Sequence, residues 1–235
     1  MFGRKSSHLE GTGYFGKFYT AGQLKWRTDL SSRTPLYLEP LVTLNRWDHF
    51  SGFATFFDEV KPSYIVQREI WGGANVGMAL GTKGLMRFDA KYAQSKDNYY
   101  QNDNFDARDT SDATEFKYAT AGLTLERNSL NRKQQPNRGE LFRVSMRYIG
   151  GDENTLPGSQ WSDRSAYVAR HDWVVLKATL DKYFIPKGIF KFGMLAEGVY
   201  STQPFFQNYT ATVLQAPAFQ PTPESKTYFI DNYRA

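Results

Sequence analysis

Apolar and polar residues alternate strictly along several segments of the chain. The clearest example is the segment 140–149, where every second residue is apolar. Its apolar set is Phe142, Val144, Met146 and Tyr148, and its polar set is Arg143, Ser145 and Arg147. The same period of two recurs at residues 23–30, 85–93, 173–184 and 189–200. This period is typical of β-strands, whereas a helix repeats every 3.6 residues, so the pattern predicts an all-β fold.

The alternating segments and the shorter apolar runs together predict about nine strands. They span residues 13–20, 23–30, 36–47, 63–80, 85–93, 115–128, 140–149, 173–184 and 189–200. Short links are predicted at 20–22, 81–84, 131–139 and 185–188, and long polar connections at 97–114, 150–170 and 203–226. Consecutive strands with short links form an antiparallel meander. Long loops at one end and short turns at the other are typical of outer-membrane barrels.

One predicted strand carries small residues on its inward face. In the segment 74–81 the outward set is Ala74, Val76, Met78 and Leu80, and the inward set is Asn75, Gly77, Ala79 and Gly81. Small side chains on one face mark a close approach of other atoms to the backbone. We therefore expect a plug or an inserted loop to lie against this position.

Composition favours a membrane barrel over a membrane helix. The mean hydropathy is −0.58, and no run of 18 apolar residues exists, which excludes a transmembrane helix. Barrel strands alternate between lipid and lumen, so a low mean hydropathy does not exclude them. Aromatic residues make up 16% of the chain, as aromatic girdles require, and the absence of cysteine suits passage through an oxidising periplasm. The net charge of +5 is modest and basic residues are interleaved with acidic ones, so no nucleic-acid partner is expected.

The alternation assigns two faces to the predicted sheet. The residues expected to face lipid are Phe142, Val144, Met146, Val174, Leu176, Leu180, Phe190, Phe192 and Met194. The residues expected to line the lumen are Arg87, Asp89, Lys91, Arg143, Arg147, Lys177, Asp181 and Glu197. Two interpretations of these charges stay open, a water-filled or plugged lumen with paired charges and a specific translocation path. A soluble β-sandwich also alternates, but it would bury its aromatic face against a second sheet.

Motifs for catalysis and metal binding are missing from the sequence. There is no Gly-x-Ser-x-Gly nucleophile motif. The histidines His8, His49 and His171 are isolated, and the acidic stretch 97–112 lacks the spacing of an EF-hand loop. No catalytic residue, cofactor or metal is therefore expected in this chain.

Several segments resemble known outer-membrane barrels. Residues 123–133 (Leu-Thr-Leu-Glu-Arg-Asn-Ser-Leu-Asn-Arg-Lys), followed by Pro-Asn-Arg-Gly at 136–139, resemble the bacterial surface antigen barrels of the outer-membrane assembly and translocation superfamily. A closer likeness is to the C-terminal barrel of Bacteroidetes patatin-like phospholipases. The segments similar to that group are 44–48, 62–69, 208–214, 216–219 and 221–227.

The resemblance implies a 16-stranded barrel preceded by periplasmic domains and, in the phospholipases, by a patatin domain with a Ser-Asp dyad. It also implies an arginine in a loop that folds into the lumen, a position that Arg234 matches. We expect residues 1–235 to form one domain, an open part of such a transmembrane barrel in a Gram-negative outer membrane. Residues 1–7 carry no signal peptide, so the chain is expected to begin inside a longer protein.

In this interpretation the chain anchors or exports a patatin-type lipase domain. There are two alternatives. One is a non-enzymatic assembly or translocation barrel of the same superfamily, and the other is a soluble β-domain with a binding role. The expected partners are outer-membrane lipid and the remaining strands and N-terminal or periplasmic domains of the parent protein. The edge strands, predicted at 13–20 and 189–200, would pair with those remaining strands.

Overall fold

The computed structural model describes residues 6–16, 19–30, 35–49, 65–101, 105, 108–132, 136–161, 165–184 and 192–216. These residues form one antiparallel sheet of nine strands, each paired with its neighbour in the chain. The strands are β1 (Ser7–Phe15), β2 (Tyr19–Asp29), β3 (Leu36–His49), β4 (Ile65–Leu80), β5 (Gly84–Tyr99), β6 (Asp112–Asn128), β7 (Gly139–Leu156), β8 (Tyr167–Phe184) and β9 (Phe192–Ser201). The helix α2 (Tyr209–Gln215) follows β9. The predicted all-β antiparallel meander is confirmed.

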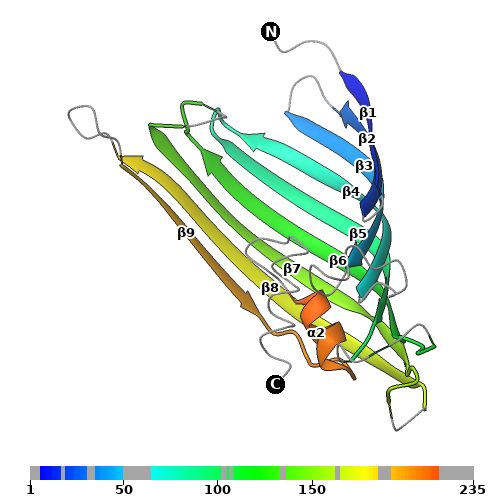
Figure 1. Ribbon diagram of the computed structural model, residues 1–235. Helices are drawn as coiled ribbons and strands as arrows, with labels where there is room; N and C mark the ends of the chain where they lie inside the picture. The colour runs from blue at the N-terminus through cyan, green and yellow to red at the C-terminus, as the bar shows by residue number, and fades with distance from the viewer. Residues whose placement is uncertain are drawn as a thin grey trace.

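The sheet curves into an open trough rather than closing on itself. β1 and β9 form its two edges and do not pair with each other. Figure 1 shows the strands tilted across the trough and α2 lying on its concave side. Strongly twisted sheets curl in this way, and an open segment of a barrel has this shape.

The first link lies elsewhere than predicted. β1 ends at Phe15, and the Gly16 amide donates a hydrogen bond to the Tyr19 carbonyl at 2.9 Å. Residues 20–22, predicted as a turn, are paired with residues 13–15 inside the β1–β2 ladder. The small residues there resemble a turn, but their ladder hydrogen bonds to β1 keep the backbone extended.

Several strands also extend into segments predicted as loops. β5 continues to Tyr99 opposite Asp112, and β7 continues to Leu156 opposite Ala113. These polar ends stay in the sheet because each has an antiparallel partner. α2 likewise occupies a predicted connection, and its N-cap Asn208 accepts a hydrogen bond from the Thr210 amide at 2.7 Å.

Among the described residues, no helix combines the length and the apolar character needed to cross a lipid bilayer.

The core of the molecule lies on the concave side of the sheet, near α2. Its buried side chains include Tyr99, Phe116, Trp173, Phe206 and Leu214. Two of these, Phe206 and Leu214, come from the segment after β9, and the others come from the strands. The core is therefore formed between the sheet and its own continuation, and no second sheet is present in the described part of the chain.

The inward glycine Gly77 of β4 is explained by cross-strand packing. It lies opposite Tyr37 of β3, and a Cβ atom at Gly77 would lie 2.2 Å from the Tyr37 ring. The aromatic ring therefore occupies the space predicted for a plug or an inserted loop. The prediction identified a close approach correctly but assigned it to the wrong neighbour.

Candidate membrane interface and charged inner face

A continuous apolar row crosses the convex face of the sheet. Cross-strand pairing places its members side by side from β3 to β9, since paired residues share a face. The row consists of Leu38, Val76, Phe88, Leu123, Met146, Leu176 and Tyr200. Phe88 is 50% exposed and Met146 is 53% exposed. This face therefore presents large apolar side chains with nothing packed over them among the described residues.

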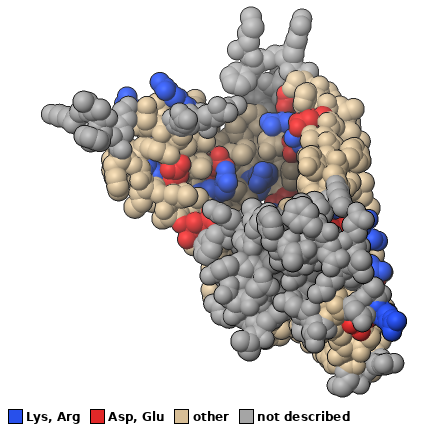
Figure 2. All heavy atoms as spheres, in the orientation of Figure 1, with Lys and Arg blue, Asp and Glu red and all other residues tan. Residues whose placement is uncertain are grey.

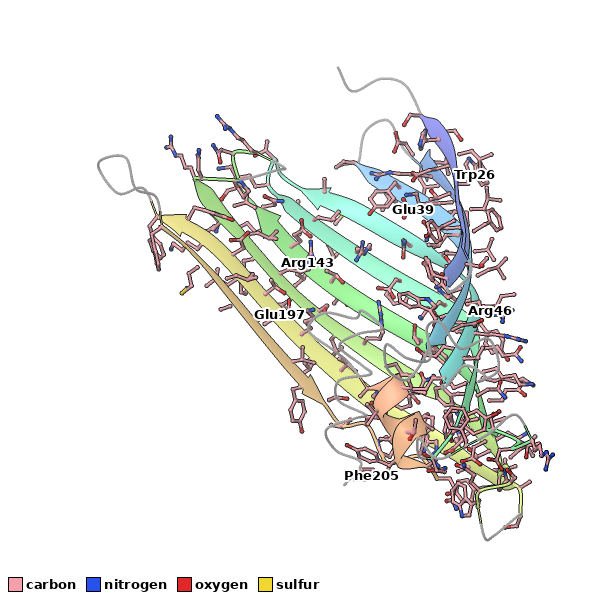
Figure 3. The ribbon with its side chains drawn as sticks, viewed as in Figure 1. Trp26, Glu39, Arg46, Arg143, Glu197 and Phe205 are labelled. Carbon is pink, nitrogen blue, oxygen red and sulfur yellow. The ribbon has the colours of Figure 1, made fainter. Side chains whose placement is uncertain are left out.

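The residues predicted to face lipid lie on this convex face, as the register shows. They are Phe142, Val144, Met146, Val174, Leu176, Leu180, Phe192 and Met194. Phe190 lies outside the described residues. Figure 3 shows Trp26 and Arg46 directed away from the trough, and Glu39, Arg143 and Glu197 directed into it.

Charged residues border the apolar face at both ends of the strands. On the outward face of β7, apolar residues and Gly150 fill the interval between Glu140 and Asp152. Outward charges lie beyond both ends of this interval. At one end Lys117 lies opposite Asp152. At the other end the Lys182 Nζ is 3.7 Å from a Glu140 carboxylate oxygen. The length of the apolar interval is close to the 9–11 residues that a tilted strand needs to cross about 30 Å of bilayer hydrocarbon.

The residues predicted to line a lumen all lie on the concave face. They are Arg87, Asp89, Lys91, Arg143, Arg147, Lys177, Asp181 and Glu197. Figure 2 shows basic and acidic side chains gathered in the hollow of the trough. Arg234, predicted to lie in a lumen loop, is outside the described residues.

Most of these inward charges form ion pairs between strands. Their N–O distances are 2.9 Å for Arg147–Asp89, 2.8 Å for Arg143–Glu126, 2.7 Å for Lys177–Glu197 and 4.0 Å for Lys91–Glu69. In the described part of the chain, the buried Nε of Arg87 has no hydrogen-bond partner. Paired charges are the pattern expected of a water-filled or plugged lumen, the first of the two interpretations.

One ion pair depends on a glycine between its partners. Gly122 lies between Asp89 and Arg147 in the cross-strand row. A Cβ atom at Gly122 would lie 2.8 Å from an Asp89 carboxylate oxygen. The missing side chain therefore lets Arg147 reach across β6 to Asp89.

The segment after β9 folds back over the concave face, and we call residues 202–216 the strap. The Phe206 ring stacks on the His171 ring at 4.6 Å and contacts the Phe116 ring at 5.1 Å between centroids. At its far end the Gln215 side chain donates to Ser95 Oγ at 2.9 Å and to an Asp97 carboxylate oxygen at 3.0 Å. The strap thus joins β9 to β5, β6 and β8 across the trough.

A chain of buried hydrogen bonds runs beneath the strap. Glu153, fully buried, accepts from Thr155 Oγ1 at 2.6 Å and from the Gln207 amide at 3.1 Å, and its Oε2 lies 2.6 Å from His171 Nε2. Because the Thr155 hydroxyl donates its hydrogen bond to Glu153, it accepts one from the Thr114 hydroxyl. The two threonine Oγ1 atoms are 2.8 Å apart. Thr114 in turn accepts from the Tyr99 hydroxyl at 2.9 Å. Burial raises the pKa of this hydroxyl far above its usual range, which keeps Tyr99 a donor.

Nothing in the sequence alone pointed to the Glu153–His171 pair. Glu153 lies in the segment 150–170, which is predicted as a loop, and His171 lies at its boundary without a metal-binding neighbour in the sequence. Once β7 and β8 are extended, the alternation of β7 directs Glu153 inward and that of β8 directs His171 inward. Within the described residues, no group of three or more His, Cys, Asp or Glu side chains is arranged to hold a metal ion.

Comparison of the chain with protein-family models, with curated proteins and with solved structures finds no match. The family resemblance read from the sequence segments therefore stays a prediction.

Proposed function

We propose that this chain forms part of the wall of a transmembrane β-barrel in a Gram-negative outer membrane. The main support is the exposed apolar face, which crosses seven strands from β3 to β9 and is bordered by charges at both strand ends. Soluble monomers rarely expose apolar patches larger than a few hundred Å². Lipid is the environment in which such a face is stable, while the ion pairs on the concave face require water or other polar groups.

The lengths of the connections orient the sheet in the membrane. At the end of the sheet where the strap lies, residues 100–111 join β5 to β6 and residues 157–166 join β7 to β8. At the opposite end β4 and β5 are joined by residues 81–83 alone. Since long loops of outer-membrane barrels are extracellular, the strap end is assigned to the cell exterior.

The two edges of the sheet need partners in this proposal. An edge strand presents unpaired N–H and C=O groups, and each unsatisfied group costs several kcal/mol in hydrocarbon. We propose that β1 and β9 pair with further strands of the parent protein, which close the barrel.

The membrane proposal is tested with two single-tryptophan forms of the chain. Trp26 is outward and 47% exposed, whereas Trp173 is inward and 4% exposed. In one form Trp26 is kept and the other four tryptophans are replaced by Phe, and in the other form Trp173 is kept. In vesicles with brominated acyl chains, we expect strong quenching of Trp26 fluorescence and weak quenching of Trp173. Absence of quenching at both positions, in the chain alone and in the closed barrel of the parent protein, would favour the soluble β-domain.

The resemblance extends the proposal to the parent protein. We propose that the barrel anchors or exports a patatin-type lipase domain, with a non-enzymatic assembly or translocation barrel as the alternative. The chain itself holds no nucleophile motif, so we expect ester hydrolysis by the parent protein and none by residues 1–235. The assay compares both on a chromogenic ester. An inactive parent would favour the alternative, and hydrolysis by the chain that a point mutation abolishes would refute the assignment.

A further inference from the structure

Three basic residues form one cross-strand row on the convex face. Arg46 of β3 lies opposite Arg68 of β4, and Arg68 lies opposite Lys96 of β5. All three side chains are exposed, and Figure 3 shows Arg46 directed away from the trough. Like charges directly opposite each other destabilise a sheet, so a row of three calls for a compensating anion.

The sheet does not compensate these charges fully. Arg46 is paired with Asp48 through two hydrogen bonds, of 3.0 and 2.8 Å. Glu115 lies opposite Lys96, but it is bound to Lys117 at 2.9 Å and accepts from Gln94 at 2.8 Å. Among the described residues, neither Arg68 nor Lys96 forms an ion pair. Within the part of the chain that the structure describes, two cations on this surface therefore lack an acidic partner.

An apolar hollow of about 440 Å³ adjoins the basic row. Phe15, Leu44 and Ile70 line it, together with Gly22, and the three basic side chains lie along it. A Cβ atom at Gly22 would meet no atom within 4 Å, so the space above this glycine is open. The hollow thus combines an apolar wall with a cationic border.

This combination lies at the level of lipid headgroups. Leu44 and Ile70 belong to the apolar face, and Arg46 and Arg68 lie one outward position closer to the strap end. In the proposed orientation that end is assigned to the cell exterior, so the row would meet the outer leaflet. The outer leaflet of a Gram-negative bacterium consists of a phosphorylated glycolipid, and guanidinium and ammonium groups bind phosphate through charge-assisted hydrogen bonds.

We propose that Arg68 and Lys96, assisted by Arg46, bind a phosphate of the outer-leaflet glycolipid, of the lipid A type, and that one of its acyl chains occupies the hollow. This inference rests on the proposed membrane function. It assigns a lipid-binding site to β2–β5, far from the charged trough.

The test compares lipid A binding by the wild-type chain and by variants. The chain is reconstituted in phosphatidylcholine vesicles that contain lipid A, dephosphorylated lipid A or phosphatidylglycerol, and bound lipid is quantified after extraction in mild detergent. We expect the double variant Arg68→Gln/Lys96→Gln to bind lipid A at least about tenfold more weakly, because two charge-assisted contacts are lost. Gly22→Leu should weaken binding by filling the hollow while leaving the charges intact. Lys182→Gln is the matched control, since this outward lysine lies at the opposite end of the strands, beside Glu140 and away from the hollow.

The outcomes separate this inference from the membrane proposal. Insertion into phosphatidylcholine vesicles is measured first, by quenching of Trp26. If the chain inserts but the double variant binds lipid A as well as wild type, only the lipid site is refuted. Equal wild-type binding to phosphatidylglycerol or to dephosphorylated lipid A would also refute it, because the phosphorylated glycolipid would not be recognised. If the chain does not insert even within the closed barrel of the parent protein, both proposals fail.

Discussion

Replacing Val144 by arginine is expected to block insertion of the sheet into a lipid bilayer. Val144 points outward from β7 between Leu125 of β6 and Ala178 of β8, in the middle of the apolar face. Arginine near the bilayer midplane destabilises a transmembrane barrel by about 2–4 kcal/mol. The measurement uses the chain within the closed barrel of the parent protein. It is the fraction that becomes resistant to protease after dilution from urea into phosphatidylcholine vesicles. We expect this fraction to fall severalfold or more for Val144→Arg.

The matched control introduces arginine on the other face. Leu195 of β9 is 71% exposed, points into the trough and lies opposite Asp181. Leu195→Arg adds the same side chain in a polar environment and beside an acidic partner, so its insertion should resemble wild type. If the two variants insert equally well, the assignment of the convex face to lipid is wrong.

The two faces of the sheet could be predicted from the sequence because side chains alternate with a period of two residues along a strand. Once residues 140–149 were recognised as a strand, Phe142 and Val144 had to share one face and Arg143 and Arg147 the other. A shift of the strand register by one residue would move every side chain of the strand to the opposite face of the sheet. This is why the predicted outward and inward sets agree with the register of the structure wherever the structure describes them.

The ends of the strands could not be read in the same way. Residues 20–22 and 150–156 are rich in small or polar residues, which are common in turns, and only pairing with a neighbouring strand shows that they are extended. Which residues pair at a strand end depends on the register of the whole ladder, and this register is set by contacts between residues far apart in the sequence. The row of Arg46, Arg68 and Lys96 was missed for the same reason, since it joins three strands that are far apart in the sequence.

The strap was the least predictable element. Its contacts join Gln207 to Glu153 and Gln215 to Asp97, which are separated by 54 and 118 positions in the sequence. Its helix is too short to show a clear period, and its hydrogen bonds go to side chains that only the folded sheet brings together. A polar network of this kind is stable when all its members are satisfied and costly when one is removed. Its central member is Glu153.

Replacing Glu153 by alanine is therefore expected to release the strap from the sheet. The substitution leaves His171, Thr155 and the Gln207 amide without their acceptor in a buried environment. Leaving a buried hydrogen-bonding group without its partner costs about 1–3 kcal/mol. The measurement is the rate of proteolysis within residues 202–216 in the folded, membrane-inserted chain, together with the urea midpoint of unfolding. We expect faster cleavage and a lower midpoint for Glu153→Ala, with a smaller change for Glu153→Gln, which keeps an acceptor.

Asp152→Ala provides the control for this prediction, because it removes a carboxylate one position away. Asp152 points outward and is exposed, so it makes no contact with the strap. Its replacement should leave the cleavage rate and the urea midpoint close to wild type, since exposed charges contribute about 0–1 kcal/mol. Equal effects of Asp152→Ala and Glu153→Ala would show that the strap is not held by the buried network. A strap that stays protected in Glu153→Ala would show instead that the rings of Phe206, Phe116 and Trp173 are sufficient to hold it.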